Sequence, residues 1–174
     1  LDFELSDKQF QTRYSDREGK NPFHFDDNFL RVELDPNDET TDELFEYLLF
    51  DSIEKIIIER KVKILIVDNL TYLSLKESEK AKNALPLMRK LQKLKKKYKI
   101  SILVLAHTPK RNLSRPITQN DLGGSKMLMN FIDSAFAIGK SHKDPLLRYI
   151  KQVKVRSTEE KYGSSNVCVC QIIK

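Results

Sequence analysis

Glycine and cysteine are scarce in this sequence. Only five of its 174 residues are glycine and two are cysteine, whereas glycine usually makes up about 7% of a protein. Two cysteines cannot build a disulfide framework. Cys168 and Cys170 lie two apart on a predicted strand, so they share a face and are poorly placed to bond each other. The cysteine content therefore favours a reducing, cytoplasmic location.

Long apolar runs are also absent. The longest candidate, 100–106, has the length of a strand, far below the roughly 18 residues of a membrane-spanning helix. Charged residues make up 32% of the chain. We therefore expect a single domain over residues 1–174 with no membrane partner. Because the sequence begins with Leu1, in what has the pattern of a strand already under way, we expect it to be part of a longer chain.

The charges are unevenly distributed along the chain. Residues 1–60 contain 7 basic and 17 acidic side chains, and residues 61–174 contain 24 basic and 8 acidic ones. A cationic C-terminal part indicates a polyanionic partner, nucleic acid first. The alternative is a set of solvated lysines around a helix.

The hydrophobic pattern predicts an α/β fold with a mainly parallel sheet. Near-continuous apolar runs at 62–67 and 100–106 are typical of central strands covered on both faces. A helix with one apolar face lies between them and ends near Tyr98. The other predicted elements are helices at 7–15 and from 42 onward, a strand at 29–34, a short helix at 125–131, a strand at 132–138, and a closing β-hairpin of 146–155 with 166–173.

Polar residues stand where the predicted strands end, which is where such sheets bind ligands. The run Ile64-Leu65-Ile66-Val67-Asp68 has the shape of a Walker B segment, whose Asp holds Mg²⁺, usually through water. Glu4, at another strand end, could orient a water for attack on a phosphate. Each of these residues also has a plainer explanation as a turn or surface residue, and His107 as a hydrogen-bonded structural histidine.

Five segments in order resemble the RecA-fold (P-loop) ATPases of the replicative-helicase type. They are Asp2-Phe3-Glu4 before a capped helix, the strand ending at Asp68, the strand ending at His107, Asp121-Leu122-Gly123-Gly124-Ser125-Lys126, and the Lys154-Val155-Arg156 finger followed by Gly163. The resemblance implies a RecA-like, mainly parallel central sheet flanked by helices, with a C-terminal β-hairpin and truncated at its N-terminus. It implies a DNA-dependent ATPase acting in replication, mobilisation or repair.

The resemblance also implies roles for individual residues. Glu4 would be the general base, Asp68 would hold Mg²⁺, and Asp68 with Asn69 would contact ATP. His107 would sense the γ-phosphate. Lys154 and Arg156 would stabilise transferred charge in a neighbouring subunit, which requires a homo-oligomeric ring or filament.

The family's phosphate-binding loop, G-x-x-x-x-G-K-[ST], is missing. Gly-Lys occurs only at 19–20 and 139–140, and the residues five before those glycines are Tyr14 and Ser134. In the family this loop would lie upstream of Leu1, so we expect the chain by itself to bind ATP weakly or not at all. A second departure lies further along the chain. Where the family has an Asp-Ala-Asp element, this sequence has Ser134-Ala135-Phe136, with Phe136 in place of the second Asp.

The connection 108–126 carries four basic residues: Lys110, Arg111, Arg115 and Lys126. Because it holds no aromatic residue, we expect it to contact phosphates of single-stranded DNA without stacking on bases. An ordinary charged surface loop is the alternative.

Two other functions remain open. One is a nucleotide-silent RecA-fold module that binds nucleic acid or a protein partner. The other is a receiver-type signalling domain with Asp68 as phospho-acceptor and Thr108 and Lys140 as its companions. The receiver needs an adjacent acidic pair after an earlier strand, whereas Asp26-Asp27 lies in a polar stretch.

Overall fold

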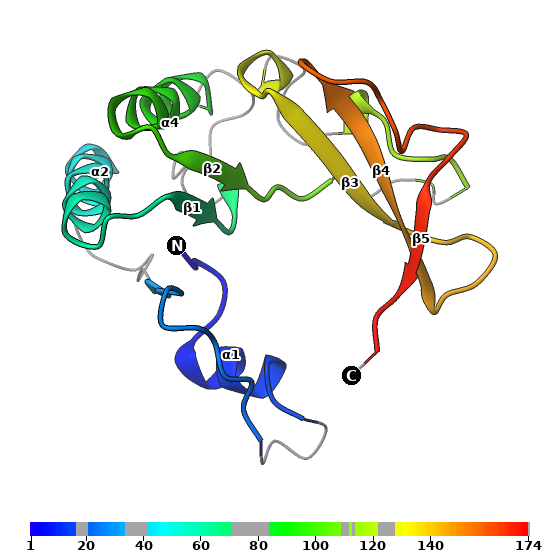
Figure 1. The fold of residues 1–174 in the computed structure, drawn as a ribbon, viewed down its shortest axis with the longest axis horizontal. Coiled ribbons are helices and arrows are strands. Elements are labelled where there is room, and N and C mark those ends of the chain that lie inside the picture. Colours follow the sequence, from blue (N-terminus) through cyan, green and yellow to red (C-terminus); the bar gives the residue numbers. More distant parts are fainter. Residues whose placement is uncertain are drawn as a thin grey trace. The chain divides into compact units, whose positions relative to one another are not determined.

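The chain forms two compact units in a computed structural model (Figure 1) that describes residues 1–16, 21–33, 42–70, 84–108, 112, 114–121 and 128–173. The first unit contains residues 1–33, helix α2 (Asp42–Glu59), strands β1 (Ile64–Val67) and β2 (Ser101–Val104), and helix α4 (Ala84–Tyr98) from Arg89 onward. The second unit contains α4 up to Met88 and the described residues from His107 on.

The first unit begins with a capped helix. Helix α1 (Asp7–Arg13) starts after Ser6, whose hydroxyl accepts a hydrogen bond from the backbone N–H of Gln9. The Gln9 side chain in turn accepts from the N–H of Ser6 at 2.9 Å, which completes a capping box. The predicted N-cap is confirmed, and the helix ends two residues earlier than predicted.

A β–α–β segment forms the centre of the first unit. Strands β1 and β2 pair in parallel, with Leu65 opposite Ile102, and α4 connects them along the chain. Two ion pairs join α4 to α2, from Lys90 to Glu46 at 2.8 Å and from Lys97 to Glu54 at 2.7 Å. The core comes from α2, α4 and one face of β1: Leu49, Ile53, Ile57, Leu65, Val67, Leu91 and Leu94.

Strand β1 is covered on one face only, which corrects the prediction of a strand covered on both. Leu65 and Val67 are buried, whereas Ile64 and Ile66 are 64% and 40% exposed. Leu103 on β2 is exposed beside them. A near-continuous apolar run does not reveal how many layers cover a strand, because that depends on elements distant in the sequence.

The prediction of a RecA-like central sheet was wrong. In the described parts of the chain, parallel strand pairing is confined to β1 and β2 and to isolated bridges from Asp2 to Glu33 and Asp68. The described α-helices are α1, α2 and α4. The strands from residue 134 onward form a separate antiparallel sheet. The structure describes residues 29–33 of the predicted strand 29–34. Strand pairing there is limited to the bridge between Glu33 and Asp2.

The second unit is built on this antiparallel sheet, with strands in the order β3 (Ser134–Lys140), β4 (Leu147–Val155) and β5 (Cys168–Gln171). Strand β3 pairs with β4 along its whole length. A short turn closes this pairing at a small entropic cost, whereas a parallel partner would need a long crossover. The predicted pairing of 146–155 with 166–173 is confirmed, and Cys168 and Cys170 are free.

Two short 3₁₀ helices, η1 (Gln119–Asp121) and η2 (Leu128–Phe131), precede the sheet. The backbone of Ile117 is held by β4: its N–H donates to the Tyr149 hydroxyl and its carbonyl accepts from Lys151 Nζ, both at 3.1 Å. Lys151 is buried, so this bond also satisfies a buried charged group. No described helix has the length and apolar character needed to cross a membrane.

Candidate functional site

Glu4, Asp68 and Asn69 come together in the first unit. The residues before Glu4 pair with the end of β1: Phe3 N–H donates to the Asp68 carbonyl and Asp68 N–H donates to the Leu1 carbonyl, both at 3.0 Å. The side-chain amide of Asn69 donates to Glu4 Oε1. Asn69 is buried and Glu4 is exposed, so a fixed amide orients a solvent-facing carboxylate.

Asp2 anchors this arrangement. Its Oδ1 accepts from the N–H groups of Glu4 and Leu5, both at 3.0 Å, and its Oδ2 accepts from Arg31 Nε at 3.0 Å. Burial alone would raise the pKa of Asp2, but the two backbone donors and Arg31 outweigh it and hold the pKa below its ordinary value. Asp2 thus fixes the backbone that presents Glu4.

These residues fit a magnesium–nucleotide group only in part. Asp68 and Glu4 are the hard oxygen donors that Mg²⁺ accepts, and Mg²⁺ keeps several waters. Among the residues that the structure describes, however, no three His, Cys, Asp or Glu side chains form a metal-binding cluster. The sequence also contains no G-x-x-x-x-G-K loop. The given sequence thus supplies carboxylates that could hold Mg²⁺, but it does not contain the loop whose backbone would bind the phosphates.

His107 belongs to the second unit and is exposed. Strand β2 ends at Val104, and its pairing continues for one further residue, because Leu105 N–H donates to the Val67 carbonyl at 2.9 Å. Along the chain, His107 follows the last residue of this pairing by two positions.

Lys154 and Arg156 lie together beside η2. Lys154 Nζ donates to the Met129 carbonyl. Arg156 Nη2 donates to the Asn130 carbonyl at 2.9 Å, and its Nη1 pairs with Asp133 at 3.1 Å. Both cations are thus bound within their own chain, and a role in a neighbouring subunit would require them to leave these partners.

The structure describes part of the basic connection. Arg115 is exposed and follows a turn in which Asn112 Oδ1 accepts from Ser114 N–H at 2.9 Å. Asp121 Oδ2 accepts from Thr118 N–H at 2.7 Å. Lys110, Arg111 and Lys126 lie outside the described residues.

The sequence interpretation missed an aromatic cluster in residues 10–29. It contains five rings with centroids 4.5–6.5 Å apart: Phe10, Tyr14, Phe23, Phe25 and Phe29. A cavity of about 280 Å³ lies among Phe10, Tyr14, Phe23 and Phe25. Three phenylalanines within seven residues, in a stretch interpreted as a polar loop, were the available signal.

No protein-family model matches this sequence, and no curated protein matches it.

Proposed function

We propose that this chain is part of a DNA-dependent ATPase that couples ATP hydrolysis to DNA binding or translocation, in a helicase or a replication, mobilisation or repair protein. The observation that carries the proposal is the hydrogen bond from Asn69 to Glu4 beside Asp68, where β1 ends. A carboxylate held by a buried amide suits a group that must orient a water molecule.

In this proposal each residue has one role. Glu4 orients the attacking water, Asn69 positions Glu4, and Asp68 holds Mg²⁺ through water. When bound, the metal neutralises charge on the phosphates. ATP and Mg²⁺ would be the cofactors of the full-length protein.

The proposed partners are single-stranded DNA and further copies of the same chain, in a cytoplasmic ring or filament. The charge distribution supports the first partner, because residues 61–174 carry three times as many basic as acidic side chains. The second partner rests on the resemblance of Lys154-Val155-Arg156 to a finger that reaches a neighbouring subunit.

A nucleotide-silent module that binds nucleic acid or a protein partner is the second candidate. One observation favours it: Lys154 and Arg156 both bind groups of their own chain. Such a module would use the basic side chains of residues 61–174 for binding and would not hydrolyse ATP.

Turnover of the full-length protein separates the two candidates. ATP hydrolysis with and without single-stranded DNA should fall at least about a hundredfold in Glu4→Gln, while ATP binding remains. Glu59→Gln, at the exposed end of α2, is the matched control and should retain full turnover. Equal turnover in parent and Glu4→Gln would contradict the proposed role. DNA binding without turnover in the parent would establish the silent module.

A further inference from the structure

The cavity in the aromatic cluster has solvent-exposed aromatic rings at its rim. Phe23 is 64% exposed at its edge, and Tyr14 is also exposed. Its volume of about 280 Å³ lies just under the roughly 300–1,000 Å³ of pockets for small organic ligands. That size suits one inserted side chain.

The charged residues lining the cavity are Asp7 and Arg31. The guanidinium of Arg31 lies 4.6 Å from the centroid of the Phe10 ring and pairs with Asp2, Asp7 and Glu33. Its side chain is 12% exposed, whereas that of Asp7 is 82% exposed. Three carboxylates thus surround one cation, and the charge that faces solvent is negative.

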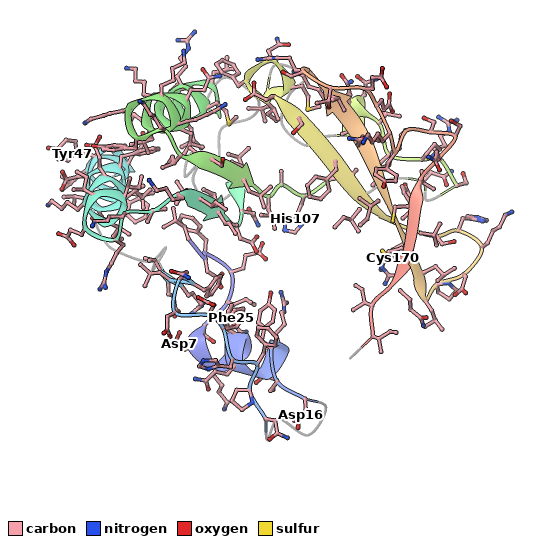
Figure 2. The ribbon with its side chains drawn as sticks, in the orientation of Figure 1. Asp7, Asp16, Phe25, Tyr47, His107 and Cys170 are labelled. Atoms are coloured by element: carbon pink, nitrogen blue, oxygen red, sulfur yellow. The ribbon has the colours of Figure 1, made fainter. Side chains whose placement is uncertain are left out.

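The segment that forms the cavity also carries a net negative charge. Residues 1–33 contain eight acidic and five basic side chains. Figure 2 labels Asp7 and Asp16 in the same part of the first unit as Phe25. The phosphate backbone of a nucleic acid would be repelled here, whereas a basic peptide would be attracted.

We propose that this aromatic cavity is a docking site for a basic peptide segment of a partner protein that inserts one aromatic or aliphatic side chain. The anchor would pack against Phe10, Phe23 and Phe25. Lysine or arginine residues flanking the anchor would pair with Asp7 and the nearby carboxylates. The charge complementarity selects a peptide over nucleic acid. This site does not depend on the proposed ATPase function.

Fluorescence anisotropy with a short labelled peptide, one Phe flanked by lysines, tests the proposal. We expect saturable binding that weakens at least about tenfold when the peptide's Phe becomes Ser, because a buried aromatic anchor carries most of such a binding energy. Replacing its lysines by glutamates should abolish binding. Higher salt should weaken binding, because the charge pairs are exposed.

Variants of the protein locate the site. Phe23→Ser should weaken binding at least about tenfold, and Tyr47→Ser, an equally exposed aromatic on α2 (Figure 2), should leave it unchanged. Gln11→Lys, on the exposed cavity wall, adds a repelling charge without altering the rings and should also weaken binding. Circular dichroism confirms folding of each variant.

Three outcomes would overturn the proposal. One is peptide binding that neither Phe23→Ser nor Gln11→Lys changes. Another is single-stranded oligo-dT binding that Phe23→Ser removes, which would make the cavity a base-stacking site. The third is self-association lost in Phe23→Ser on sedimentation with no peptide bound, which would assign the cavity to a second copy of the chain.

Discussion

The side-chain amide of Asn69, at the end of β1, donates a hydrogen bond to the carboxylate of Glu4, 65 residues away in the sequence. Asn69 is 1% exposed. Truncation in Asn69→Ala therefore removes a buried donor together with its packing. We expect a loss of about 1–3 kcal/mol in the free energy of unfolding, measured by urea denaturation.

The matched control is Asn28→Ala. Asn28 donates to the Asp26 carboxylate at 2.8 Å on the exposed surface, so its loss should cost no more than about 0.5 kcal/mol. An equal cost in the two variants would contradict the importance given to the buried Asn69 side chain.

Because of Asp2, the free energy of unfolding should depend on pH in the acidic range. Its pKa is held below the ordinary value, so it contributes stability above about pH 4, the ordinary pKa of Asp, which is lost as the pH falls through the folded-state pKa. Asp2→Asn should be less stable than the parent at pH 7, and the two should converge in strong acid. A constant difference between their urea midpoints from pH 7 to pH 2 would show that the Asp2 charge is unimportant.

Gly139 has no room for a side chain. A Cβ at this position would lie 2.2 Å from the Tyr149 ring, the residue opposite it on β4. Gly139→Ala must therefore displace Tyr149 and strain its hydrogen bond to Ile117, at a cost of about 1–3 kcal/mol in thermal unfolding. In Gly163→Ala the new Cβ meets only the flexible end of Glu160, so this variant should be much milder. A Gly139→Ala cost that persists unchanged in a Tyr149→Ala background would refute the steric explanation.

Lys99 has the left-handed backbone conformation that favours glycine. It follows α4 with φ 52°, and Ile100 N–H donates back to the Lys95 carbonyl at 3.3 Å, as in a glycine-ended helix. Lys99→Gly should raise the free energy of unfolding by about 0.5–1 kcal/mol, because an L-residue is strained there. Lys96→Gly, inside the last turn, should lower it by about 1 kcal/mol. A fall in the melting temperature of Lys99→Gly would disprove this reading of the helix end.

Local chemistry made much of the secondary structure predictable. The Ser6 cap, the apolar face of α4 and the β4–β5 pairing each depend on residues that are close in the sequence. The candidate site was predictable only as separate strand ends. Asp68 was singled out from its position after an apolar run and Glu4 from its place at the end of a predicted strand, whereas the bond from Asn69 to Glu4 depends on two segments meeting.

The sequence by itself determined the capped helix α1, the apolar strands and the charge difference between the two parts of the chain, because these follow from spacing and composition. Only the tertiary structure decided which face of β1 is buried, that β3 pairs with β4, and that aromatic rings from residues 10–25 line a surface cavity. The physical reason is that burial and strand pairing are competitions between distant segments. Their outcome is set by packing and chain entropy over the whole fold.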